Sequence, residues 1–207
     1  MIKFLLPKEL FTRGISMEEV EIKNNAVTGV TYNSNKTEVT VKEHIENFFI
    51  KEIKVLVSEK PNHFIIAADK ICSGIELLGK IIDNIKELDV SGRSELNFTS
   101  ALKRFETLNK YSAPTYIKKI KKNNKTKSVT KSALYKDVRC SFSHGLMNGK
   151  YINITSSING GIIKSGDKWK LGAVEFFKDF EQACNELLQS KEDYIVKKLN
   201  TVLYDVF

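Results

Sequence analysis

The sequence has 207 residues, with 33 Lys and Arg against 25 Asp and Glu, and a formal net charge of +8. At roughly 150 residues per domain, this length predicts one compact domain with an arm. Hydrophobic residues make up 42% of the chain and there are only 11 Gly and 3 Pro, which excludes a collagen-like or globally disordered protein.

Export, membrane insertion and a disulfide framework are not expected. The apolar run that opens the chain stops at Pro7 and is shorter than the core of a signal peptide. No apolar run approaches the roughly 18 residues of a transmembrane helix. Cys72, Cys140 and Cys184 are odd in number and form no CxxC pair, so they indicate neither disulfides nor a zinc site. We therefore expect a cytoplasmic protein with no metal and no other cofactor.

Residues 1–40 are predicted to form an arm, because their apolar residues follow neither the helical nor the strand period well. They are either irregular or contain a hairpin, in which Val27–Tyr32 would pair with Glu38–Val41 across a turn at Asn33–Asn35. The period changes at Val41, where the main body begins.

Apolar residues at three- and four-residue steps predict five helices in residues 41–207. They run from Val41 to the residues before Pro61, from Phe64 to Ile85, from Phe98 to an end near Ala113-Pro114, from about Thr130 to His144, and from Phe176 to Leu203. A β-hairpin or a three-stranded ribbon is predicted at about 150–172, with turns at Gly160-Gly161 and Ser165-Gly166. The expected fold is mainly α: an antiparallel helical bundle with a small β-hairpin before the last helix.

The positive charge is local. Residues 117–131 contain seven lysines and no acid, so the chain without this segment has a charge of about +1. We predict a flexible loop that attracts nucleic-acid phosphates, with a merely solvated loop as the alternative. The segment has no interleaved aromatic residue, so no base-stacking platform is expected there. The candidate binding residues are Lys118, Lys119, Lys121, Lys122, Lys125 and Lys127.

The lysine-rich segment leads into ALYKDVRCSFSHGL, which places Arg139 five residues before His144. An imidazole can exchange a proton near neutral pH, and a guanidinium offers a permanent fork of donors to a phosphate. On one continuous helix these side chains would lie about 140° apart. A helix that ends before Gly145 would let the imidazole turn back, and two copies of the motif could also meet across an interface.

The chain resembles the HEPN superfamily, whose signature is R-x4-6-H. The resemblance rests on LYKDVRCSFSHG at 134–145, on GIELLG at 74–79 and on GDKWKLGAVEFFKDFEQA at 166–183. It implies a helical-bundle homodimer in which Arg139 and His144 of both subunits face one cleft. An acidic or polar residue from an earlier helix often joins them in the family, and we expect Glu76 in that place, with Asp69 as the second choice.

The resemblance also implies metal-independent endonucleolytic cleavage of RNA to 2′,3′-cyclic phosphate and 5′-hydroxyl ends. His144 would be the general base and Arg139 would stabilise charge on phosphorus, in a toxin or antiviral-defence effector that has an antitoxin or defence-system partner. Many active members carry a polar residue, frequently Asn, directly after the arginine, where this chain has Cys140. The alternative function is a non-catalytic RNA- or protein-binding module, and a third is a helical adaptor.

Each candidate residue also has a purely structural interpretation. His144 could cap the carbonyls at the end of a helix, and Arg139 could pair with Asp137 or Glu175. Glu76 could be the solvent edge of an amphipathic helix, and Cys140 a small filler of the core rather than a nucleophile.

Overall fold

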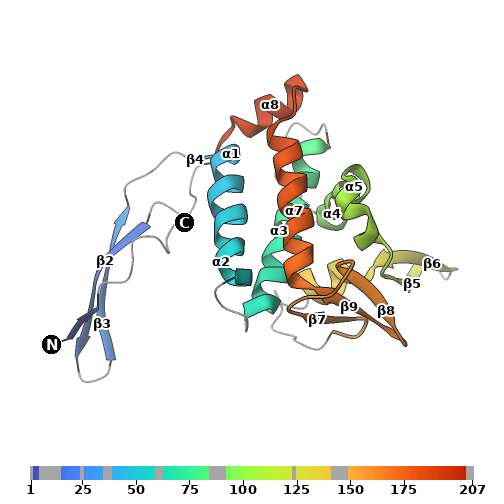
Figure 1. The fold of residues 1–207 in the computed structure, drawn as a ribbon, viewed down its shortest axis with the longest axis horizontal. Coiled ribbons are helices and arrows are strands. Elements are labelled where there is room, and N and C mark those ends of the chain that lie inside the picture. The colour runs from blue at the N-terminus through green and yellow to red at the C-terminus, as the bar shows by residue number, and fades with distance from the viewer. Residues whose placement is uncertain are drawn as a thin grey trace.

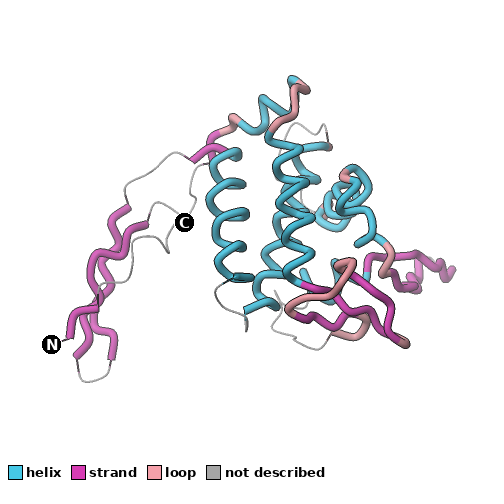
Figure 2. The backbone as a smooth tube through the Cα atoms, viewed as in Figure 1, coloured by secondary structure: helices cyan, strands magenta, loops and turns pink. Residues whose placement is uncertain are grey.

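A computed structural model describes residues 2–4, 15–23, 26–34, 39–58, 63–83, 92–122, 125–140 and 149–203. It is mostly helical with small sheets, which confirms the predicted class at that level (Figure 1). The helices lie at the centre. Strands β2 and β3 lie on one side of them, and β5 to β9 gather on another side (Figure 2).

The predicted first helix is confirmed as a continuous helical segment. It comprises α1 (Val41–His44), a π-helical stretch η2 (Ile45–Lys51) and α2 (Glu52–Ser58). Thr40 and Glu43 form a capping box: the Glu43 N–H donates to the Thr40 hydroxyl (3.2 Å), and the Glu43 carboxylate accepts the Thr40 N–H (2.8 Å). This reciprocal cap explains why the helix begins at Val41.

The predicted second helix is α3 (Phe64–Ile82). It packs against α4 (Ser94–Arg104), α7 (Ala173–Leu188) and the π-helical turn η5 (Tyr135–Cys140). Two glycines make these contacts close. A Cβ at Gly79 would lie 1.8 Å from the Asn97 carbonyl oxygen of α4. A Cβ at Gly74 would lie 2.3 Å from the Phe180 ring of α7. The GIELLG segment therefore has a packing role at both of its ends.

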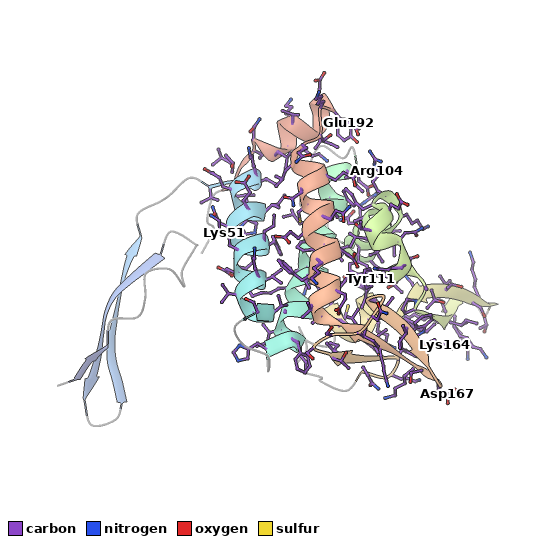
Figure 3. The ribbon with its side chains drawn as sticks, viewed as in Figure 1. Lys51, Arg104, Tyr111, Lys164, Asp167 and Glu192 are labelled. Atoms are coloured by element: carbon purple, nitrogen blue, oxygen red, sulfur yellow. The ribbon has the colours of Figure 1, made fainter. Side chains whose placement is uncertain are left out.

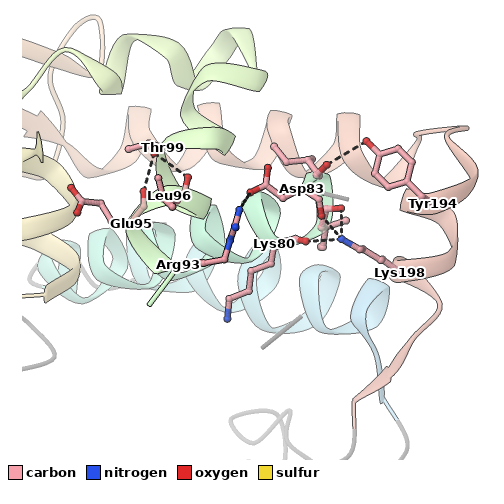
Figure 4. A network of polar contacts seen from close by, with 10 residues as sticks. Lys80, Asp83, Arg93, Glu95, Leu96, Thr99, Tyr194 and Lys198 are labelled. Carbon is pink, nitrogen blue, oxygen red and sulfur yellow. Dashed lines mark hydrogen bonds and ion pairs between the residues drawn. The ribbon is translucent and has the colours of Figure 1, made fainter. Parts of the chain in front are cut away.

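The C-terminal end of α3 is capped by a lysine from α8 (Asp193–Leu199). Lys198 Nζ donates to the carbonyl oxygens of Lys80 (2.8 Å), Ile81 (3.1 Å) and Asp83 (2.5 Å), as Figure 4 shows. A cation at the C-terminal end of a helix satisfies carbonyls that lack intrahelical partners. The predicted last helix is thus divided into α7 and α8, and α8 turns back to close the end of α3.

The third predicted helix is also divided, at Phe105, into α4 and α5 (Glu106–Asn109), with a 3-10 turn η4 (Lys110–Ser112) after it. Tyr111, which Figure 3 labels, is fully buried, and its hydroxyl donates to Asp179 Oδ2 of α7 (2.6 Å). This bond joins the end of the α4–α5 segment to α7.

The predicted N-terminal hairpin is wrong in its pairing. Strands β1 (Ile2–Phe4), β2 (Ile15–Lys23) and β3 (Ala26–Ser34) form an antiparallel sheet in which β3 pairs with the preceding β2. The residues after the expected turn include β4 (Val39–Thr40), which pairs instead with β10 (Val202–Leu203). Nonlocal pairing with the end of the chain has replaced the expected local hairpin.

The lysine-rich segment is not a loop but an antiparallel pair of strands, β5 (Thr115–Lys122) and β6 (Lys125–Ser132). Strand β6 occupies the expected start of the fourth helix near Thr130. The chain turns into that helix only at Ala133, whose N–H donates to the Pro114 carbonyl (2.9 Å). Cross-strand pairing has therefore overridden the low strand propensity of lysine.

The segment before α7 forms a mixed three-stranded sheet, which agrees in strand number with the predicted three-stranded ribbon and not with the alternative of a hairpin. Strand β9 (Lys168–Gly172) lies between β8 (Ile162–Ser165), to which it is antiparallel, and β7 (Ile152–Thr155), to which it is parallel.

Among the described residues, no helix is both long enough and apolar enough to cross a membrane.

Candidate functional site

Arg139 lies on η5 (Tyr135–Cys140), a π-helical turn that packs against α3. Val138 and Asp137 are buried in this turn, whereas Arg139 and Cys140 are half-buried. Single π-helical turns occur frequently at functional sites, because the extra residue re-aims the side chains that follow.

Arg139 faces Glu76 of α3, the acidic residue that the family resemblance implied. Arg139 Nε lies 3.4 Å from Glu76 Oε2, and Lys80 Nζ lies 3.8 Å from Glu76 Oε1. The Glu76 side chain is only 9% exposed, so it is not the solvent edge of its helix. Because a buried carboxylate is costly unless a cation compensates it, the two basic groups explain how Glu76 is accommodated.

The Arg139 side chain is 30% exposed, whereas its Nε atom, which faces the Glu76 carboxylate, is buried. Asp69 and Cys72 share the face of α3 that carries Glu76, at three- and four-residue steps. Burial raises the pKa of Asp69, and the positive charges of Arg139 and Lys70 oppose that rise. The structure thus brings both acidic candidates of α3 near Arg139.

Cys140 has the properties of a structural residue. Partial burial raises the pKa of its thiol above the ordinary value, although Tyr135 and Arg139 act to lower it. The thiol is therefore protonated at neutral pH and is a poor nucleophile. This agrees with the interpretation of Cys140 as a small filler.

Asp137 holds η5 in place, a role that the sequence reasoning missed because it considered this residue only as a partner of Arg139. It is 9% exposed, and its Oδ2 accepts the backbone N–H groups of Tyr151 and of Ile152, the latter at 3.0 Å. Glu175, the other acid considered for Arg139, accepts from the Ser157 hydroxyl (2.5 Å) and the Ile158 N–H (2.9 Å). Both carboxylates therefore have local structural partners.

The remaining predicted site residues are His144 and the lysines of the β5–β6 strands, and some of them lie outside the described part of the chain. His144 lies outside the described residues, so the geometry of the Arg139–His144 spacing is not seen. The side chains of Lys118, Lys119, Lys121 and Lys127 are exposed on the β5–β6 strands. The backbones of Lys122 and Lys125 pair at the ends of those strands, and their side chains lie outside the described part.

Within the described part of the chain, no three His, Cys, Asp or Glu side chains are grouped so that they could hold a metal ion.

Comparison with protein-family models, curated proteins and solved structures finds no match to this chain.

Proposed function

We propose that the protein is a metal-independent endoribonuclease of the HEPN type, a cytoplasmic helical-bundle homodimer that acts as a toxin or antiviral-defence effector with an antitoxin or defence-system partner. The observation that carries the proposal is the contact between Arg139 and Glu76. The resemblance selected these two residues from distant helical segments, and they lie side by side in the fold.

In the proposed reaction, His144 accepts the proton of a ribose 2′-hydroxyl as that oxygen attacks the adjacent phosphorus. The bond from phosphorus to the 5′-oxygen breaks, and a water or the partner subunit's equivalent histidine protonates the departing oxygen. The products are a 2′,3′-cyclic phosphate and a 5′-hydroxyl. Arg139 stabilises the negative charge that develops on the phosphoryl oxygens.

Glu76 is a positioning residue in this proposal. Its carboxylate, buried between Arg139 and Lys80, restrains the guanidinium edge that carries Nε. A charge-assisted contact of this kind limits the rotamers of a long side chain, so that less conformational entropy is lost when a phosphate binds.

The second candidate is a non-catalytic RNA-binding module, and the β5–β6 strands favour it. Their exposed lysines form a concentrated positive surface, and Arg139 could hold a phosphate without cleaving the strand. Contacts between lysines and phosphates release counterions, so this function also predicts binding that weakens steeply with salt.

The experiment is incubation of the purified protein with single-stranded RNA in EDTA, with product ends and binding both measured. We expect cleavage products that carry 2′,3′-cyclic phosphate and 5′-hydroxyl ends. Intact RNA that binds in a salt-dependent way would replace the nuclease with the binding module. Absence of both cleavage and binding would overturn both functions.

A further inference from the structure

Two tyrosines from separate segments stack at the base of the lysine-rich strands, beneath a lysine of η5. The rings of Tyr116 of β5 and Tyr151, which precedes β7, lie 5.2 Å apart at their centroids, with an angle of 15° between their planes. Both side chains are half-buried. Residues 117–131 contain no aromatic residue, but the fold brings an aromatic pair to the base of the β5–β6 strands.

Two lysines lie over this pair. Lys136 Nζ of η5 is 4.6 Å from the Tyr116 centroid and 5.7 Å from the Tyr151 centroid, and Lys150 Nζ is 5.3 Å from the Tyr151 centroid. Cations within about 6 Å of an aromatic centroid are attracted by the ring. Lys136 and Lys150 are both exposed, so their ammonium groups are held by the rings and also reach solvent.

The backbone at and just before Tyr151 is held by two neighbouring elements, η5 and β9. Asp137 of η5 accepts its N–H, and the Trp169 N–H of β9 donates to its carbonyl (2.8 Å). Lys168 Nζ donates to the Gly149 carbonyl (3.2 Å). The tyrosine pair is therefore a fixed platform, and η5, which carries Lys136 and Arg139, is tied to it.

The platform joins the lysine-rich strands to the turn that carries Arg139, because Tyr116 belongs to β5 and the Tyr151 N–H donates to Asp137 of η5. Lys118 follows Tyr116 by two residues and projects from the same face of β5, while Lys136 precedes Arg139 by three residues on η5. Two acids lie near Tyr116. Glu95 is engaged by Lys131 Nζ (2.6 Å) and by the Ser132 N–H (3.3 Å), and Asp137 accepts the N–H groups of Tyr151 and Ile152. Positive groups thus follow one another from the strands to Arg139.

We propose that Lys136 and Lys150, held over the Tyr116–Tyr151 pair, bind two phosphates of an RNA strand between the lysine-rich strands and Arg139. This inference rests on the proposed function and specifies where the strand runs. A lysine restrained by a ring loses less rotamer freedom on binding than a free surface lysine, so each contact is stronger.

The test is a salt titration of binding to a labelled single-stranded oligoribonucleotide with 2′-O-methyl riboses, which the proposed reaction cannot cleave. For single strands, each lost phosphate contact reduces the slope of log K against log salt by about 0.7. We therefore expect the double variant Lys136→Gln, Lys150→Gln to lose about 1.4 from the slope.

The matched control is Lys103→Gln, Lys191→Gln, which makes the same change in net charge at exposed positions. Lys103 adjoins Arg104, and Lys191 adjoins Glu192. Figure 3 labels Arg104 and Glu192 far from Lys164 of β8, which shares a sheet with β7, the strand that directly follows Tyr151. The control is expected to change the slope little. A second variant, Tyr116→Leu, keeps both lysines and is expected to weaken affinity several-fold at constant slope.

The outcomes separate the two proposals. Equal slopes for the two double variants, with strong RNA binding by the parent, would overturn the phosphate path and leave the proposed function standing. Absence of RNA binding by the parent would overturn both.

Discussion

Replacement of His144 by alanine is expected to reduce the rate of RNA cleavage by about a hundredfold or more, because general-base catalysis typically contributes factors of 10² to 10⁴. RNA affinity should change little, since the proposed phosphate contacts come from Arg139 and the lysines. Single-turnover cleavage of a labelled RNA, with affinity measured in parallel, separates the two effects.

His63→Ala is the matched control, because His63 lies at the start of α3 and has no part in the proposed reaction. Its cleavage rate should equal that of the parent. Arg139→Lys should also lose most of the activity, because an ammonium lacks the fork of donors that a guanidinium offers to a phosphate. Unchanged cleavage by the His144 variant would remove that residue from the mechanism.

Replacement of Asp137 by alanine is expected to lower the free energy of unfolding by about 2–4 kcal/mol, because it leaves one buried and one partly buried backbone N–H group without an acceptor. These are the N–H groups of Tyr151 and Ile152, which the carboxylate now satisfies. Denaturation by urea, followed by circular dichroism, measures the loss. Asp137→Asn keeps an acceptor oxygen at the same position and should lose less.

Asp167→Ala is the control for this prediction, because Asp167 is exposed in the turn between β8 and β9, where Figure 3 labels it. It should change the free energy of unfolding by less than about 0.5 kcal/mol. If Asp137→Ala is no more destabilising than this control, Asp137 does not anchor η5 to β7.

The helices with a strong apolar period were predictable from the sequence. The first helix and α3 lie close to the expected ranges, because their buried residues recur at the helical period and both bury that face in the core. The breaks at Phe105 and before α8 were missed, since an apolar stripe continues across each break and the turn is decided by packing against other elements.

The strands were harder to predict because their partners are not determined by local pattern. The β5–β6 strands contain lysine at many positions, so composition indicated a loop, whereas their stability comes from a register that joins Thr115 to Ser132 and Lys122 to Lys125. Similarly, β4 pairs with a strand at the other end of the described chain.

The candidate site was only partly within reach of sequence reasoning. Glu76 could be selected from its place on the long helix through the family resemblance, and the structure sets it against Arg139. Asp137 and the Tyr116–Tyr151 pair could not be foreseen, since each contact joins segments whose proximity depends on how the strands and η5 are packed.

The measurement that tests the central claim most directly compares an RNA oligonucleotide with the same molecule carrying a single 2′-deoxyribose at the cleaved position, both in EDTA. Because the proposed nucleophile is the 2′-hydroxyl, the RNA should be cut to a 2′,3′-cyclic phosphate, and the deoxy-substituted strand should bind equally well but stay intact at that position. Cleavage of the deoxy-substituted strand at the same bond would contradict the account, because it would require a different nucleophile.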